Sequence, residues 1–317
     1  IFNSTINKTV KQGVFASANI GYNEVLFLDV SARNDWASTL ALTGNQSYLY
    51  PAFGLSAVIS QMIQLPEAIS YLKVRASNSM TGNEVPFNVV NPWNSIGGAG
   101  GPSGIGGINR NSQVPFTNLN PEIITSNEAG ADIKFFNGRL GFDFTYYNSV
   151  STNQFLSLAA PSGSGYSSYF VNAGKIVNKG FELTIDAQPF RTDNFAWDIT
   201  LNYSYNDSKI VSTNDENTNI TMDEPRSRNL NVTHIVGETY GALYGTSYNR
   251  DAQGRIIHDL DPDGTPIPQV GARKILGFGV SPTSIGISNN FRYKNFNMSV
   301  LVEGKYGGQM YSGTNAM

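Results

Sequence analysis

The sequence has no cysteine and little charge. Lys, Arg, Asp and Glu together make up 14% of its 317 residues, and only two histidines are present. The absence of cysteine excludes disulfides and thiolate metal sites, while soluble domains average about 25% charged residues. The formal net charge is −3. With no basic cluster to neutralise phosphates, nucleic acid is not expected as a partner.

Long hydrophobic runs are also missing. No segment approaches the roughly 18 apolar residues that a membrane-spanning helix needs, and helical periodicity is weak, with one plausible helical turn at 65–69. Aromatic residues reach 12% and there are 32 glycines. Low charge, abundant aromatics and no helical span are together typical of a transmembrane β-barrel. A soluble β-protein rich in Gly, Asn and Ser is the alternative, since its shorter strands also alternate.

The clearest pattern is a strict apolar–polar alternation over residues 195–206. One face of this segment carries Phe195, Trp197, Ile199, Leu201, Tyr203 and Tyr205. Side chains on a strand alternate between faces, so the segment has one apolar and one polar wall. At about 3.3 Å per residue and a tilt of about 40°, such a strand crosses roughly 30 Å, the thickness of the hydrocarbon core of a bilayer.

The same period-two pattern predicts ten strands. They cover residues 12–22, 25–36, 48–60, 69–80, 125–136, 139–150, 175–189, 195–208, 283–293 and 296–306. The connections alternate between short turns and long segments, the long ones at 37–47, 81–124, 151–174 and 209–282. Short periplasmic turns and long extracellular loops are the arrangement of bacterial outer-membrane barrels.

The alternation also assigns charged side chains to one face. On the polar faces of five predicted strands stand Arg33, Asp35, Asp143, Glu182, Asp186, Asp198 and Glu303. We expect these to face the barrel lumen, because a charge on the lipid face costs roughly 2–4 kcal/mol. Aromatic residues gather near both ends of the strands, Phe190, Trp197 and Phe291 near the short turns, and Tyr48, Tyr50, Tyr146, Tyr147 and Tyr205 near the long loops, as expected of two interfacial girdles.

Trp93, in the long segment 81–124, is a candidate ligand contact. Asn91 and Asn94 flank it; sugar rings stack on aromatic faces, and Asn side chains match hydroxyls as both donor and acceptor. Packing of the Trp93 ring onto a neighbouring segment is the alternative.

Metal and catalytic motifs are weak. Asp259, Asp261 and Asp263 resemble the first half of an EF-hand calcium loop, but the twelfth position is Val270 and Pro262 interrupts the loop. An Asp-Pro-Asp-Gly turn explains the same residues without a metal, so we expect no cofactor, with calcium as the alternative. His234 and His258 both lie in the segment 209–282, and no nucleophile motif accompanies them. We therefore expect no enzymatic activity.

Several sequence words resemble the barrel of SusC/RagA-like TonB-linked outer-membrane proteins, in the family's order. They are Ser31-Ala32-Arg33-Asn34-Asp35-Trp36, Tyr50-Pro51-Ala52-Phe53-Gly54-Leu55-Ser56, Lys73-Val74-Arg75-Ala76-Ser77, Asn120-Pro121-Glu122 with Phe135-Phe136, and Phe142 through Asn148. The most specific match is Asn172-Ala173-Gly174-Lys175-Ile176-Val177-Asn178-Lys179-Gly180-Phe181-Glu182-Leu183. Together these words cover most of the chain.

The resemblance implies a 22-stranded outer-membrane barrel of a Gram-negative bacterium, occluded by a plug domain and energised through TonB. It further implies a SusD-like surface lipoprotein as partner and import of glycans or, in some members, peptides. The lumen-facing charges would then contact the plug. On this reading residues 1–317 are part of the barrel domain, and the N-terminal plug, the TonB-contacting segment and the last strands lie outside the sequence. A non-transporting barrel, serving as an adhesin or surface scaffold, is the alternative.

Overall fold

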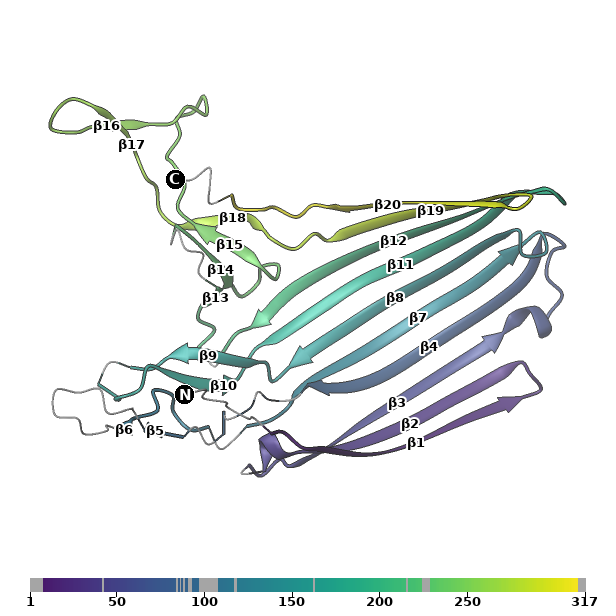
Figure 1. The fold of residues 1–317 in the computed structure, drawn as a ribbon, viewed down its shortest axis with the longest axis horizontal. Coiled ribbons are helices and arrows are strands. Elements are labelled where there is room, and N and C mark those ends of the chain that lie inside the picture. The colour runs from purple at the N-terminus through teal and green to yellow at the C-terminus, as the bar shows by residue number, and fades with distance from the viewer. Residues whose placement is uncertain are drawn as a thin grey trace.

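Ten long strands form one antiparallel sheet in this computed structural model, which describes residues 8–312 except 42, 84, 86, 88, 91–92, 97–107, 117–118, 162, 215 and 224–228 (Figure 1). In sheet order they are β1 (Lys11–Tyr22), β2 (Leu26–Ala37), β3 (Ser47–Val58), β4 (Ile69–Asn83), β7 (Glu122–Phe135), β8 (Leu140–Thr152), β11 (Lys175–Arg191), β12 (Phe195–Ser212), β19 (Thr283–Tyr293) and β20 (Phe296–Tyr306). All ten predicted strands are confirmed. The sheet is open, with β1 and β20 at its edges.

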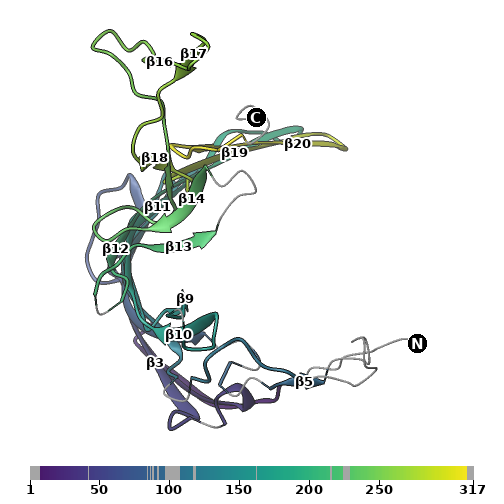
Figure 2. The same ribbon diagram turned by 90° about the vertical axis from the view of Figure 1, so that its left-hand side faces the viewer.

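The registers confirm the alternation of faces. Leu183 of β11 pairs with Phe144 on β8 and Tyr203 on β12, whereas the next residue, Thr184, pairs with Asp143 and Asn202. Apolar residues therefore line up with apolar residues across strands, and polar with polar. Figure 2 shows that the sheet is curved like an open trough, with β9, β10, β13 and β14 on its inner side.

The convex face of the trough is apolar and bare. Large hydrophobic side chains stand exposed along every one of these strands except β7, among them Ile20, Leu28, Leu55, Val74, Phe144, Phe190, Tyr205, Ile287 and Val302. On β11, Phe181 lies within the same face between the rings of Phe144 and Tyr205. Contiguous exposed apolar surface on this scale is a lipid-facing or partner-facing surface. No helix in the described part of the chain is long and apolar enough to cross a membrane.

The hydrophobic core lies among the connections at the long-loop end rather than under the sheet. Leu40, Val85, Val89, Val90 and Leu119 are buried together there, with Ala37 at the end of β2. Leu40 belongs to a short 3₁₀ helix, η1 (Ser38–Leu40). A single sheet with one lipid-facing wall needs no core of its own, so the buried apolar residues collect where loops fold over one another.

The long connections contain strands that the alternation pattern did not predict. The connection between β12 and β19 holds a four-stranded sheet, ordered β13 (Ile220–Asp223), β14 (Leu230–His234), β15 (Ala242–Gly245) and β18 (Lys274–Phe278), and a projecting hairpin of β16 (His258–Leu260) and β17 (Pro266–Pro268). Two further pairs are β9 (Phe155–Ala159) with β10 (Ser168–Asn172), and β5 (Ser95–Ile96) with β6 (Ile108–Asn109). Each of these strands has at most five residues, too few for an alternation of period two to stand out.

Two details of the sequence reading are wrong. Residues 65–69 form no helical turn; a 3₁₀ helix, η2 (Ile59–Gln61), precedes them, and Leu65 is biased to extended backbone by Pro66. Among the aromatics expected in the outer girdle, Tyr48, Tyr50 and Tyr147 lie on the concave face, since their partners in register are Asp35, Arg33 and Gly180. At the other end the girdle forms as expected, with Trp197 stacked between Phe190 and Phe291 at centroid distances of 6.1 and 5.6 Å.

A matched pair of substitutions tests the facing of β11. Leu183→Arg puts a cation on the convex face and should cost roughly 2–4 kcal/mol in a bilayer, whereas Thr184→Arg puts the same group on the polar face. We expect the full-length Leu183→Arg protein to be depleted from outer-membrane fractions, and Thr184→Arg to accumulate like the wild type. Equal accumulation of both would contradict the assignment of faces.

Candidate functional site: the concave face of the sheet

The concave face gathers the charged side chains of the sheet. Each residue predicted to face the lumen is found there, since all seven share one face by strand register: Arg33, Asp35, Asp143, Glu182, Asp186, Asp198 and Glu303. Their contact with a plug stays a prediction. The side chains nearest the long loops on this face, including Ile176 and Ile210, are buried under loop elements. The rest of the face is open.

Arg75 is the central cation of this face. It is not among the seven charged residues that the sequence predicts to face the lumen. It reaches from β4 across β7 to β8, where its Nη1 donates to Asp143 Oδ2 at 3.1 Å and its Nη2 donates to Asp143 Oδ1 and to Thr145 Oγ1. Gly130 on β7 makes this possible, because a Cβ there would lie 2.9 Å from Arg75 Nε. Both partners are 36–45% exposed, so in this sheet alone the pair adds little stability.

Near the long loops, a second glycine of the concave face lets an aromatic ring cross its strand. Gly180 on β11 has no side chain, and the ring of Tyr147 lies over it: a Cβ at 180 would sit 2.5 Å from the Tyr147 hydroxyl. That hydroxyl donates to Asn206 Oδ1 on β12 at 3.0 Å. The ring thus crosses β11 and ties β8 to β12, which explains the glycine in the most specific of the family words.

The amide of Asn172, in the same word, fastens the loops. Its Nδ2 donates to the carbonyls of Asn120 at 2.7 Å and Asn153 at 3.0 Å, and its Oδ1 accepts from the Asn120 amide at 2.6 Å. One side chain therefore satisfies backbone groups of two connections that are far apart in sequence. Asn172 positions the long-loop end over the sheet.

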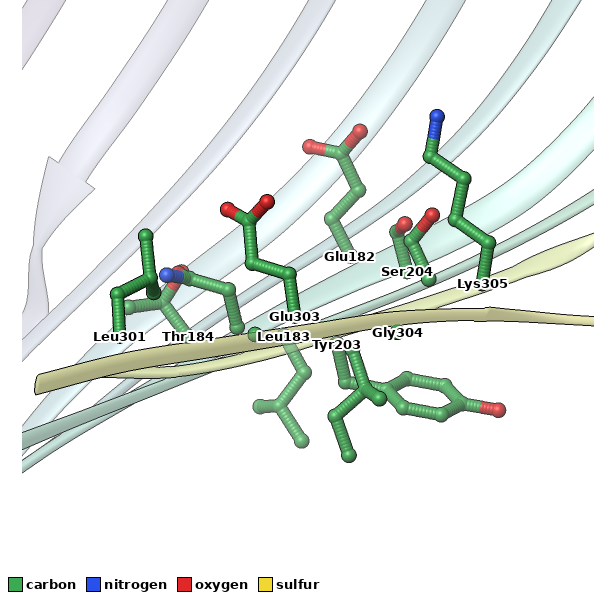
Figure 3. A pocket seen from close by; sticks show the side chains of 13 residues that line it. Glu182, Leu183, Thr184, Tyr203, Ser204, Leu301, Glu303, Gly304 and Lys305 are labelled. Atoms are coloured by element: carbon green, nitrogen blue, oxygen red, sulfur yellow. The ribbon is translucent and has the colours of Figure 1, made fainter.

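A groove of about 290 Å³ lies on the concave side of β11, β12, β19 and β20, and Figure 3 shows the side chains that line it. Glu182, Glu303, Lys305 and Ser204 point into it, while Leu183 and Tyr203 point the other way. Within the described residues, neither carboxylate forms an ion pair. Two unpaired carboxylates and one ammonium on a shared wall suit a polar or cationic group of an incoming partner.

The remaining predicted lumen residues have mixed surroundings. Asp186 accepts a hydrogen bond from Thr200 Oγ1 at 2.6 Å. Asp198 lines a separate groove with Arg292 and Asn290. Arg33 Nε and Asp35 Oδ1 pair within β2 at 2.7 Å beside Gly13, where a side chain would collide with both. Glycines opposite long charged side chains thus recur across this face.

The structure describes two of the three predicted ligand contacts, Trp93 and Asn94. Trp93 is 59% exposed and meets Phe87 edge to face, with ring centroids 5.6 Å apart. Asn94 Oδ1 accepts the backbone N–H of Asn111 at 2.7 Å, and Asn91 lies outside the described residues. The Trp93–Phe87 contact favours the packing interpretation for this ring, although most of the ring faces solvent.

The aspartates of the calcium-like motif serve a tight turn. Asp261 Oδ1 accepts the backbone N–H of Asp263 at 3.0 Å and of Thr265 at 2.8 Å, and Asp259 Oδ1 accepts from Gln269 Nε2 at 3.4 Å. Asp251 makes the same turn ten residues earlier, accepting from Gln253 and Arg255. In the described part of the chain no three His, Cys, Asp or Glu side chains are grouped as metal ligands.

The two histidines occupy different environments. His234, on β14, is 2% exposed; its Nε2 has no hydrogen-bond partner, and its ring lies 4.8 Å from that of Tyr240. His258 is exposed on the β16–β17 hairpin. Over the residues described, neither histidine is paired with a carboxylate, as a hydrolytic dyad would require. Absence of enzymatic activity stays a prediction.

These features describe one wall of a transmembrane barrel: an open sheet of long antiparallel strands, apolar outside, charged inside, with structured loops at one end. The sequence model of the protein family described as TonB-dependent receptor-like, β-barrel, matches residues 2–315 of this chain. The chain belongs to this family.

Two TonB-dependent receptors and one solved structure agree with that assignment. TonB-dependent receptor P3 of Formosa agariphila is 26% identical over 337 residues, covering 98% of this chain and 33% of the relative. TonB-dependent receptor SusC of Bacteroides thetaiotaomicron is 26% identical over 203 residues, covering 61% of this chain and 20% of SusC. The RagAB peptide importer in its open-open state shares the fold, with a TM-score of 0.78 at 18% identity over 95% of this chain and 33% of that one. The chain thus spans about a third of the length of the first of these relatives.

The buried histidine predicts a pH response of the four-stranded loop sheet. Burial lowers the pKa of His234 below its usual 6.5, so the unfolded segment binds a proton at a higher pH than the folded one. Stability of this sheet is therefore full above about pH 6.5 and falls as the pH drops toward the lowered pKa.

We expect hydrogen exchange of β14 in the full-length protein to accelerate between pH 7.5 and pH 5, after correction for the intrinsic pH dependence of exchange. His234→Phe should remove this extra acceleration, because no group is left to protonate. His258→Phe, on the exposed hairpin, is the control and should behave like the wild type. An unchanged pH response in His234→Phe would contradict the role of His234.

Proposed function

We propose that the whole protein imports a nutrient across the outer membrane of a Gram-negative bacterium, energised by TonB. The observation that carries this is the division of the sheet into two walls in a chain of the TonB-dependent receptor family. An apolar outer wall suits lipid, and a charged, glycine-spaced inner wall suits a conduit that holds a movable domain. The plug and the TonB-contacting segment belong to the proposal.

We further propose a SusD-like surface lipoprotein as the partner at the long-loop end and a glycan as the substrate, with a peptide as the second candidate. The similarity to SusC supports the lipoprotein. The solved neighbour described as a peptide importer keeps peptides in view. The loop region offers Asn and Tyr side chains suited to hydroxyl or amide ligands. No metal, organic cofactor, nucleic acid or enzymatic step is part of this proposal.

An adhesin or surface scaffold with no transport is the alternative function. Growth of a strain that lacks the gene, on single polysaccharides or on protein hydrolysates, distinguishes the two functions. An importer predicts a growth defect on its substrate that is restored by the gene, and restoration fails when TonB is absent. Binding of ligand at the surface with no TonB-dependent uptake of any substrate would favour the scaffold.

The groove of Figure 3 supplies a sharper test. Glu182→Gln together with Glu303→Gln removes two inward carboxylates while keeping side-chain size. Since a hydrogen bond to a charged group contributes roughly 1.5–3 kcal/mol, we expect uptake to fall by about tenfold or more. The amount of assembled barrel should stay at the wild-type level, because the face is not in lipid. Glu67→Gln, in the short connection before β4, is the matched control; equal uptake by the double variant and this control would contradict a role for the groove.

A further inference from the structure

Three lysines interrupt the apolar convex face at its long-loop end. Lys175 and Lys179 on β11 and Lys209 on β12 have the same parity as Val177 and Phe181, which are on the convex face, and all three lysines are exposed. We call this group the convex lysine patch. The other strands of the sheet carry no Lys or Arg on this face at this level; β8, β7 and β4 carry Asn148, Asn127 and Asn78 there.

The register brings the three ammonium groups together. Val177 pairs with Lys209, so Lys209 is the diagonal neighbour of Lys179; Lys175 is two residues from Val177 on the other side, where a register shift pairs it with Ser212. Diagonal neighbours across antiparallel strands lie about 7–8 Å apart, well within reach of two flexible four-carbon stems. Three cations can therefore converge on a single anionic group beside the sheet.

The charge of the patch is not neutralised within the chain. Asp207 lies directly opposite Lys179 and is the one acidic side chain that the described strands place on this part of the face. Across the described residues, none of the three lysines forms an ion pair or a side-chain hydrogen bond. The patch keeps a net charge of about +2, counting three lysines against one aspartate.

The patch lies at the level of the lipid headgroups. The aromatic row of Tyr146, Phe181 and Tyr205 ends the apolar band, as aromatic rings do at the headgroup level. Lys179 stands two residues beyond Phe181, roughly 6.6 Å further toward the long loops. Ammonium groups there sit just outside the hydrocarbon, where anionic headgroups attract them.

We propose that the convex lysine patch binds the phosphate groups of a lipid in the outer leaflet. The site is separate from the import route, being on the opposite face of the sheet, and it rests on the proposed membrane orientation with the long loops outside. It would hold one phosphorylated lipid against β11 and β12, the strands under the loop sheet that contains His234.

The test uses the full-length protein purified in mild detergent. Native mass spectrometry would compare binding of lipid A with binding of the same lipid after removal of its phosphates. We expect the wild type to prefer the phosphorylated form. The variant with Lys175→Gln, Lys179→Gln and Lys209→Gln should bind it at least tenfold more weakly, since each lysine near an anionic surface changes affinity about fivefold.

Two further variants keep the result interpretable. Lys73→Gln and Lys134→Gln on the concave face, combined with Lys274→Gln on β18, remove the same charge away from the patch and should leave lipid binding unchanged. The variant with Lys175→Arg, Lys179→Arg and Lys209→Arg keeps the charge of the patch. It should preserve lipid binding even if the Gln variant assembles poorly. The proposal is overturned if the Gln variant binds like the wild type, if dephosphorylated lipid binds equally well, or if inorganic phosphate alone displaces the lipid at millimolar concentration.

Discussion

The backbone hydrogen bonds between ten long antiparallel strands are the constraint on which the structure depends. In a hydrocarbon environment each unpaired N–H or C=O costs several kcal/mol, so each spanning strand must pair on both sides. The observed sheet meets this for the eight inner strands and leaves β1 and β20 with one unpaired edge each. Closure therefore needs further strands. Once the strands are paired, successive side chains point to opposite faces of the sheet. The convex face therefore carries apolar residues and the concave face carries polar ones.

Glycines on the concave face leave room for the long charged or aromatic side chains that cross them. Arg75 passes over Gly130, Tyr147 passes over Gly180, and the Arg33–Asp35 pair lies over Gly13. A side chain at any of these glycines would occupy the space of the residue that crosses it. Inter-strand contacts on this wall are thus made by side chains that lie flat across neighbouring strands. Such a wall stays smooth while still presenting charge.

The sheet could be predicted from the sequence because one physical rule, alternation between lipid and water, is repeated over many residues in each strand. The seven concave-face charges followed from the same rule. Arg75 was missed as the central cation because its role depends on Gly130 and Asp143, which lie on two other strands. The loop strands were missed since short segments carry no readable period, and β14 is buried on both faces, with Leu230, Asn231, Thr233 and His234 all enclosed.

The loop sheet and the barrel wall differ in how they tolerate polar groups. On the wall, charges face open space and can be satisfied by water or by a partner, so they cost little. In the loop sheet, Asn231, Thr233 and His234 each bury a polar atom with no partner among the described residues. Leaving such groups unpaired costs about 1–3 kcal/mol each, which lowers the stability of this sheet relative to the wall. A segment of low local stability above a rigid wall is the part of such a structure that opens first. The long-loop end, rather than the strands, is therefore where a rearrangement costs the least free energy.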